Sequence, residues 1–388
     1  MEKPTFFISE TCTRQPINYL PKEKHEKDLK EKVIEVLLAP FKFILGLIQC
    51  IVVLFLLFCG LFLKGGPKEL FIGEGIFGAR AATPDKFNKM IDTAGTETPT
   101  TTNVSSTTLF SSDNNQLKAV TIINSPIDKF VKTPGANPFH FTKTESTTDP
   151  YRSTGKWIVF IPGMHSSTES HHSVMWDLYR ATDVEGVICC NPPGIGDSQG
   201  VTRTPEDFFE ASSAAIRYIQ EKHNKDHPET PLEITLWGHS LGGTSAMHNA
   251  NLEEFKEINI RVVLDRTFTK YDRAIRYSSL IFTPCVQLLR SYIRKHFPLN
   301  LKEKVRETNR QIVVIASEKD EVIHVDSASA ITIESENIRG RFLTSFKKET
   351  GSGEICEENK RKASLTPEHS FRHTLETIRT IWNDFVTN

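Results

Sequence analysis

A serine between spaced glycines is the strongest chemical signal in this sequence. Residues 238–242 read Gly-His-Ser-Leu-Gly, which is the pattern Gly-x-Ser-x-Gly with Ser240 at its centre. An apolar run precedes the motif and a helix-compatible run follows it. On a sharp strand-to-helix turn, such a serine exposes its Oγ at the carboxyl edge of a sheet, and the glycines leave room for neighbouring backbone. The pattern therefore indicates nucleophilic attack by Ser240, the alternative being a glycine-rich structural turn.

The motif and its context resemble the α/β-hydrolase superfamily, from about Leu117 to the C-terminus. Residues 191–198 read Asn-Pro-Pro-Gly-Ile-Gly-Asp-Ser and keep the Gly-x-Gly-x-Ser part of a loop of that family. Asn-Pro-Pro replaces the family's charged residues there, and no third glycine is in register for a dinucleotide-binding fingerprint. The resemblance implies a serine hydrolase whose catalytic residues follow in the order serine, acid, histidine.

The resemblance places the acid after a late strand. Asp320 follows the apolar run Ile312–Ala316, although Ser317 stands where relatives usually have glycine. The rival acids are Asp265, at the end of the preceding predicted strand, and Asp326. An isolated aspartate after a strand is otherwise a turn or cap residue.

Three histidines follow Asp320. His369 lies between the last predicted strand and the last predicted helix, which matches the histidine loop of the family. His324 is too close to the acid loop, and His373 falls within the predicted helix, where a packed or solvated histidine is the ordinary interpretation. We therefore expect His369 to take the proton of Ser240, while Asp320 fixes the tautomer of the imidazole.

Acyl chemistry also needs two backbone N–H donors for the developing oxyanion. Leu241, directly after the nucleophile, supplies one of them by position. The second donor follows the apolar run Trp157–Ile161, where many relatives have His-Gly and this chain has Pro-Gly. Met164 is the expected donor, with His165 as the alternative.

Strands and helices must alternate to position these residues. Because several of the predicted strands are apolar throughout, we expect a doubly wound, mostly parallel α/β sheet of the α/β-hydrolase type, covered by helices on both faces. The predicted strands are Val120–Ile123, Trp157–Ile161, Val187–Cys190, Ile234–Trp237, Arg261–Leu264, Ile312–Ala316 and Arg341–Ser345. The predicted helices are Ser173–Arg180, Pro205–His223, Leu241–Leu252, a stretch within Tyr271–Phe297, and Phe371–Val386.

Segment 266–310 is interpreted as a small lid. Its apolar side chains Phe282, Leu288 and Phe297 would shape an acyl pocket, the alternative being ordinary helical packing. The lid belongs to the predicted hydrolase domain, residues 117–388.

The N-terminal part is organised differently. Residues Phe43–Leu63 contain no charge, and a helix of this length spans a hydrocarbon core of about 30 Å. We expect a single-pass transmembrane helix at 43–63 rather than a signal peptide or a buried core helix. A charged tail at 1–42 precedes it, and a Ser/Thr-rich linker at 64–116 follows it. The flanking lysines do not decide which side of the membrane the hydrolase domain faces.

Composition excludes several other classes of function. Lys and Arg number 47 and Asp and Glu 48, so the formal net charge of −1 offers no basic field for nucleic acid. No Cys/His spacing resembles a metal site, and no nucleotide or flavin signal occurs, so we expect no cofactor. The adjacent Cys189 and Cys190 lie in an apolar run, which indicates buried thiols rather than a disulfide framework.

These observations predict a membrane-anchored serine hydrolase that cleaves an ester or thioester through an acyl-enzyme. The predicted contact with the lipid bilayer through Phe43–Leu63 favours an acyl-lipid or acyl-protein substrate. The alternatives are an inactive hydrolase fold that serves as an interaction module at the membrane, and an acyltransferase or peptidase with the same triad. In layout and in its Asn-Pro-Pro-Gly-x-Gly loop the chain also resembles a chlamydial family of membrane-anchored proteins of this size, which implies no substrate.

Overall fold

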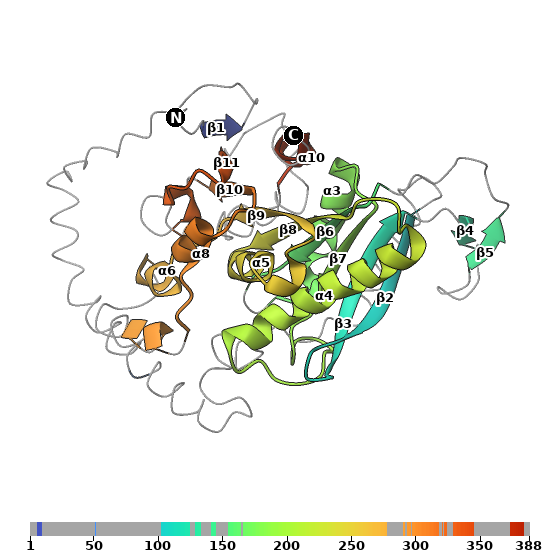
Figure 1. The fold of residues 1–388 in the computed structure, drawn as a ribbon, viewed down its shortest axis with the longest axis horizontal. Helices are drawn as coiled ribbons and strands as arrows, with labels where there is room; N and C mark the ends of the chain where they lie inside the picture. Colours follow the sequence, from blue (N-terminus) through green and yellow to red (C-terminus); the bar gives the residue numbers. More distant parts are fainter. Residues whose placement is uncertain are drawn as a thin grey trace, which may run out of the picture.

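The computed structural model describes the chain in segments. They are residues 6–9, 102–124, 129–132, 141–144, 154–163, 166–277, 297–317, 329–344 and 373–383, with residues 51, 290, 291, 293–295, 320, 322 and 323. Figure 1 shows how these segments assemble around one large sheet.

This sheet has nine strands in the described part of the chain, in the order β1-β11-β10-β9-β8-β6-β7-β3-β2. All neighbours from β1 to β7 in this order are parallel, whereas β3 runs antiparallel to both β7 and β2. The expected mostly parallel sheet is therefore confirmed. The strands are β1 Phe6–Ser9, β2 Thr102–Phe110, β3 Gln116–Asn124, β6 Lys156–Ile161, β7 Gly186–Cys190, β8 Glu233–His239, β9 Asn259–Asp265, β10 Ile312–Ser317 and β11 Ile338–Thr344.

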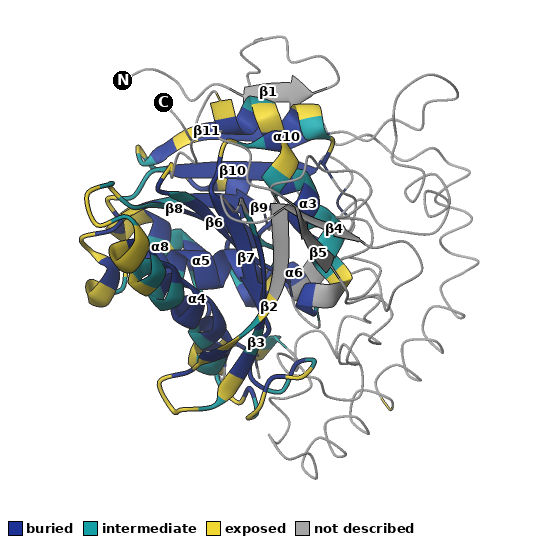
Figure 2. Cartoon of the chain, turned by 90° about the vertical axis from the view of Figure 1, so that its right-hand side faces the viewer, coloured by how far each residue is buried: buried dark blue, intermediate teal, exposed yellow. Residues whose placement is uncertain are grey.

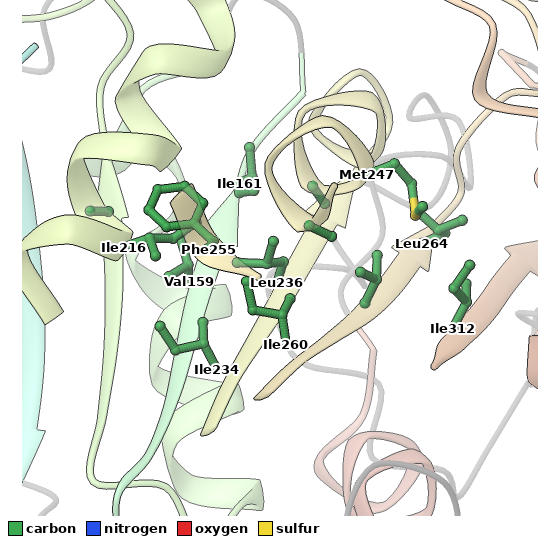
Figure 3. Packing of buried hydrophobic residues seen from close by; sticks show 14 of the residues in the cluster. Val159, Ile161, Ile216, Ile234, Leu236, Met247, Phe255, Ile260, Leu264 and Ile312 are labelled. Atoms are coloured by element: carbon green, nitrogen blue, oxygen red, sulfur yellow. The ribbon is translucent and has the colours of Figure 1, made fainter. Parts of the chain in front are cut away.

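Helices cover both faces of the sheet, as the apolar strands predicted. On one face, α4 (Pro205–Asp226), α5 (Gly242–Ala250) and α8 (Leu301–Glu307) share a core with the strands (Figures 1 and 3). On the other face, α3 (His172–Ala181) and α10 (Leu375–Ile381) form a second core. Figure 2 shows the strands between these layers buried almost throughout. The shorter helical elements are η2 Thr168–His171, η3 Glu253–Phe255, α6 Tyr271–Tyr277 and η4 Ala330–Thr332.

Local sequence explains where α4 begins. The Thr204 hydroxyl accepts a hydrogen bond from the Asp207 amide at 3.2 Å, and the Asp207 carboxylate accepts one from the Thr204 amide at 2.9 Å. This reciprocal pair is a capping box, and Pro205 occupies the first helical position, where no N–H is needed. The expected start of this helix is confirmed.

The buried cysteines also agree with expectation. Cys189 and Cys190 are free thiols in the interior, on β7. Burial raises the pKa of the Cys190 thiol well above its usual value, which makes it a poor nucleophile.

The sheet begins earlier in the chain than the predicted boundary between linker and hydrolase domain. Residues Thr102–Phe110, which fall in the predicted linker, form β2 and pair with β3, with Leu109 opposite Leu117. The tract contains several threonines, and β-branched residues favour strands, so a low apolar content does not exclude a strand at the edge of the sheet. The sheet therefore begins by Thr102 rather than at Leu117.

Three further differences concern short elements. The predicted tail contains β1, which pairs with β11, and a separate two-stranded sheet joins β4 (Lys129–Lys132) to β5 (Phe141–Thr144). Helix α10 begins later than predicted, because Thr374 caps it by accepting from the Thr377 amide at 3.2 Å.

Most of the predicted membrane segment lies outside the described residues. Ile51 is described, and it is helical and 60% exposed. Among the helices that the structure describes, none has both the length and the apolar character needed to cross a bilayer.

Candidate active site

The order of the strands creates a topological switch point at the carboxyl edge of the sheet. From β6 the chain passes to β7 on one side, and then returns to place β8 on the other side of β6. In open α/β sheets, ligands bind at such a switch point, outside the carboxyl ends of the strands. The segment after β6 contains Gly163, and the segment after β8 contains Ser240, so both predicted parts of the site lie there.

Ser240 adopts the strained backbone expected of a nucleophile on a sharp turn. It follows β8, precedes α5, and has φ of 53°. Its N–H donates to the carbonyl oxygen of Asp265 at 2.9 Å, and its own carbonyl oxygen accepts from the Gly243 amide at 3.2 Å. A left-handed conformation at a residue other than glycine costs about 1–3 kcal/mol and persists only where the surroundings hold it. These bonds to the next strand and the next helix hold it here.

The two glycines of the motif are required by close backbone approach. A Cβ built on Gly242 would lie 2.0 Å from the carbonyl oxygen of Ile161, and one built on Gly238 would lie 2.5 Å from that of Gly242. No side chain fits at these distances. The spacing of glycines around Ser240 is therefore explained by the packing of α5 against β6 and β8.

The expected oxyanion site is partly described. Leu241 is the N-cap residue that directly precedes α5, and no backbone oxygen of the described residues accepts from its N–H. A Cβ built on Gly163 would lie 3.5 Å from Ser240 Oγ. The segment after β6 thus lies against the side chain of Ser240. Met164 and His165, the two candidates for the second donor, lie outside the described residues.

Asp320, the expected acid, is buried just after β10. Its Oδ1 accepts hydrogen bonds from the amides of Val322 at 2.9 Å and Ile323 at 2.6 Å. These bonds orient the carboxylate within its turn. His369, the expected base, lies outside the described residues, as do His324 and Asp326.

The structure brings together a different set of charged side chains beside Ser240. Asp265 accepts from Arg266 Nε at 2.8 Å and from Arg266 Nη2 at 3.0 Å, and its Oδ1 lies 2.9 Å from His373 Nε2. Each of these side chains is at most 5% exposed. We refer to these three residues, Asp265, Arg266 and His373, as the buried triplet.

The charge state of Asp265 follows from its neighbours. Burial alone would raise the pKa of this carboxyl group, but the Arg266 guanidinium and the His373 imidazole outweigh burial and hold the pKa well below its usual value. An ionised carboxylate only accepts hydrogen bonds, so His373 Nε2 carries the proton that it shares with Asp265. The contact of 3.2 Å between Nε2 and Arg266 Nη2 is then a consequence of packing rather than a hydrogen bond.

Two more histidines flank the nucleophile turn. The ring of His171 lies 5.6 Å from that of Phe160 and 6.4 Å from that of His239, the residue before Ser240. Burial lowers the pKa of His171, and Arg266 contributes in the same direction. Near neutral pH the imidazole of His171 is therefore uncharged.

Apolar side chains gather above the carboxyl edge. Leu241 packs in one cluster with Phe297, which is 1% exposed and is the one of the three apolar side chains named for the lid that the structure describes. Phe282 and Leu288 lie outside the described residues. A cavity of about 10 Å³ lies nearby, between β6, Pro162 and α4, and it has room for one water molecule rather than an acyl chain. The other members of the apolar cluster are Phe208, Phe209, Phe268, Tyr271, Ala274, Ile293, Leu299 and Ile323.

The sequence pattern identifies only part of the buried triplet. It offers Asp265 as a rival acid because this residue ends a strand, whereas it favours ordinary helical packing for His373. Arg266 carries no signal, because nothing in its neighbourhood marks a left-handed residue in the sequence. The predicted strand that ends at Asp265 does place this residue at the carboxyl edge of the sheet. That position is the signal in the sequence that points to the triplet.

Comparison with known proteins finds similarity at the level of solved structures. No family model matches the chain, and no curated protein matches it. The esterase Pf2001 of Pyrococcus furiosus is 14% identical with a TM-score of 0.45, over 73% of this chain and 93% of that one. An α/β hydrolase of Vibrio vulnificus is 14% identical with a TM-score of 0.46, over 77% and 88%. Est1E of Butyrivibrio proteoclasticus, in a structure with ferulic acid bound, is 14% identical with a TM-score of 0.44, over 73% and 100%. The solved structures that this chain resembles thus include esterases and an α/β hydrolase.

Proposed function

We propose that this protein is a membrane-tethered serine hydrolase of the α/β-hydrolase type, which cleaves an ester or thioester through an acyl-enzyme. The observation that carries the proposal is Ser240 at φ of 53°, held between β8 and α5 with its Oγ facing the segment after β6. A strained serine at the switch point of a parallel sheet is the geometry that nucleophilic acyl chemistry requires.

In the proposed reaction, Ser240 Oγ attacks the acyl carbonyl carbon while His369 takes its proton. The N–H groups of Leu241 and Met164 stabilise the oxyanion that forms on the carbonyl oxygen. The tetrahedral intermediate collapses, the alcohol or thiol leaves with the proton from His369, and the acyl group remains on Ser240. Water, deprotonated by His369, then attacks the acyl carbonyl carbon. The bond to Ser240 Oγ breaks as His369 returns the proton to Oγ, and the carboxylic acid is released.

The proposed acid is Asp320. Asp265 is the less suitable candidate because both of its carboxylate oxygens already bind Arg266 and one of them also binds His373. Asp320→Asn should lower kcat by about 10³–10⁴-fold while the fold persists, because the imidazole then loses the partner that sets its tautomer. Asp265→Asn should mainly lower stability. A kcat that falls more in Asp265→Asn than in Asp320→Asn would assign the acid to Asp265.

A fluorophosphonate probe tests the proposal directly on the full-length chain in detergent. We expect the wild-type protein to be labelled at one serine and Ser240→Ala to remain unlabelled. Ser112→Ala, at an exposed loop position, is the matched control and should label like the wild type. Absence of labelling in a folded wild-type protein would favour the inactive interaction module, and equal labelling of Ser240→Ala would move the nucleophile elsewhere.

The proposed tether is residues Phe43–Leu63, and the pairing of β1 with β11 bears on how they would sit in a bilayer. This pairing holds Phe6–Ser9 on the same side as the sheet. A single crossing of the bilayer by the tether would place Phe6–Ser9 and the sheet on opposite sides of the membrane. A segment that enters and leaves the bilayer on the same side would keep β1 paired with β11. Protease protection of epitope tags at both ends, in sealed vesicles, distinguishes the two arrangements: equal protection indicates a hairpin, and unequal protection indicates a single pass.

The proposed substrates carry an acyl chain, since a tether raises the enzyme's concentration at acyl-lipids and acyl-proteins. The apolar cluster around Leu241 and Phe297 supports this choice, because it borders the nucleophile at the carboxyl edge. We expect kcat/KM for p-nitrophenyl esters to rise from acetyl to octanoyl. A flat profile would count against an apolar acyl pocket.

A further inference from the structure

We propose that the buried triplet of Asp265, Arg266 and His373 is a positioning device for the catalytic residues. The inference rests on the proposed function, since it concerns how Ser240, Asp320 and His369 are brought together. The three residues of the triplet take no part in the proposed chemistry themselves.

Residues 265 and 266 connect three consecutive strand ends. The carbonyl oxygen of Asp265 accepts from the Ser240 amide at 2.9 Å, which ties the nucleophile turn to β9. The Arg266 amide donates to the carbonyl oxygen of Ile315 at 2.8 Å, which ties β9 to β10 just before the strand leads towards Asp320. Asp265 and Arg266 thus fix the Ser240 turn and the end of β10, which precedes the predicted acid, relative to each other along the strand direction.

The same dipeptide also binds the C-terminal segment. Its Asp265 carboxylate accepts from His373 Nε2 at 2.9 Å, over 108 residues of sequence. His373 directly precedes Thr374, the cap of α10. Four residues separate His373 from His369, so the chain allows at most about 14 Å between this anchor and the proposed base.

Helix α10 has a second anchor at its other end. The indole N–H of Trp382 donates to Asp183, whose carboxylate also accepts from Lys156 at 2.7 Å. Between the two anchors, Ile378 and Ile381 pack in the core that α10 shares with α3. The helix is therefore held at both ends, and the bond from His373 to Asp265 is the anchor on the side of the catalytic loop.

Burying these charges costs free energy, which indicates that the charged set contributes something that apolar packing would not. Two charges removed from water lose solvation, which their attraction repays only with good geometry and further hydrogen bonds. Apolar residues would pack the same space at no such cost. What the charged set adds is direction, because Asp265 holds Arg266 through two hydrogen bonds and His373 through a third.

A matched pair of variants at His373 tests the role. His373→Gln places an amide N–H where Nε2 lies and can still donate to Asp265, whereas His373→Met keeps the bulk and removes the donor. We expect His373→Met to lower kcat for p-nitrophenyl butyrate by about 10–100-fold with little change in KM, because small misplacement of reacting groups costs this much. His373→Gln should stay within about threefold of the wild type. The control His227→Ala, at the end of α4, should leave both constants unchanged.

The measurements separate this inference from the proposed function and from mere stability. Fluorophosphonate labelling of the wild type is checked first, since its absence overturns the proposed function itself. Rates are then compared per folded molecule, well below the melting temperature of each variant. If His373→Met equals the wild type per folded molecule, the triplet only stabilises the fold. If His373→Gln is as inactive as His373→Met, the histidine itself is the base. Should His373→Met fail to fold, Arg266→Lys replaces it, since a single ammonium keeps the charge but not both bonds, and the same loss of kcat is expected.

Discussion

The strands β8 and β9 both end in a turn with a left-handed residue, but this residue is a small serine after β8 and a long, charged arginine after β9. Ser240 after β8 has φ of 53°, and Arg266 after β9 has φ of 47°. The N–H of Ser240 donates to Asp265 on β9, and that of Arg266 donates to Ile315 on β10, so one backbone device is repeated on two adjacent strands. The side chains differ in surroundings: Ser240 is partly exposed, whereas Arg266 is 4% exposed.

The difference teaches what each strained turn is for. At Ser240 the turn places a small, partly exposed hydroxyl near Gly163, and the glycines two residues before and after it let α5 approach. At Arg266 the turn directs a long cation inward, where it meets the carboxylate of the preceding residue, Asp265. No glycine lies two residues before or after Arg266, where Leu264 and Phe268 stand. We propose that the first turn serves chemistry and the second serves position, and variants at the two turns should separate these roles.

The largest effect is expected at the chemical turn. Ser240→Ala removes the nucleophile and should lower esterase kcat by at least about 10⁴-fold, because the members of a catalytic triad act as a unit. Melting temperature should change little. Ester hydrolysis and thermal unfolding, measured on the same preparation, check both halves. Residual activity above a hundredth of the wild type would show that another residue acts as nucleophile.

The next effect is expected at the positional turn, and it concerns stability. Arg266→Met leaves the Asp265 carboxylate buried without its cation, which should lower the free energy of unfolding by about 3–5 kcal/mol. Urea unfolding measures it. Arg339→Met, at an exposed position on β11, is the control and should stay within about 0.5 kcal/mol. Equal stability of the two variants would contradict the ion pair as a structural element.

A smaller effect concerns the strain itself. Glycine adopts a left-handed φ without the clash that a Cβ causes. Ser240→Gly should therefore be more stable than Ser240→Ala by about 1 kcal/mol, although both are inactive. Chemical unfolding of the two variants provides the measurement. If alanine proves as stable as glycine, the turn stores no strain at this position.

The smallest contrast is expected at acid pH. Since the folded pKa of Asp265 lies below its unfolded value, its contribution to stability is complete above the unfolded pKa of about 3.9 and is lost as the pH falls through the folded pKa. Without Arg266 the pKa is depressed less, so the loss, which starts at the same unfolded pKa, ends at a higher pH and is smaller. The melting temperature of the wild type should therefore fall further than that of Arg266→Met below about pH 4, and the two curves should approach each other. Parallel curves would contradict the role of Arg266.

The elements that bury apolar runs could be predicted from the sequence. Each of the seven predicted strands is present in the sheet, and the cap at Thr204 marks the start of α4 correctly. The strand at the edge of the sheet was harder to predict from the sequence. This strand, β2, is rich in Ser and Thr, and its stability depends on pairing with β3 rather than on its own hydrophobicity. Strand β1 is similar, because a short segment becomes a strand only through a partner more than 300 residues away.

The sequence by itself determined the strand-to-helix turn at Ser240, the proposed nucleophile. Gly238, Ser240 and Gly242 satisfy a local steric requirement, the approach of α5 to the strands, and a local requirement is recorded in adjacent residues. Only the tertiary structure decided the buried triplet. Asp265 and His373 meet across 108 residues, and no spacing in the chain encodes that meeting. The physical reason is that a buried charge is stabilised by whatever the fold brings to it, and the fold, rather than the neighbouring sequence, brings His373 to Asp265.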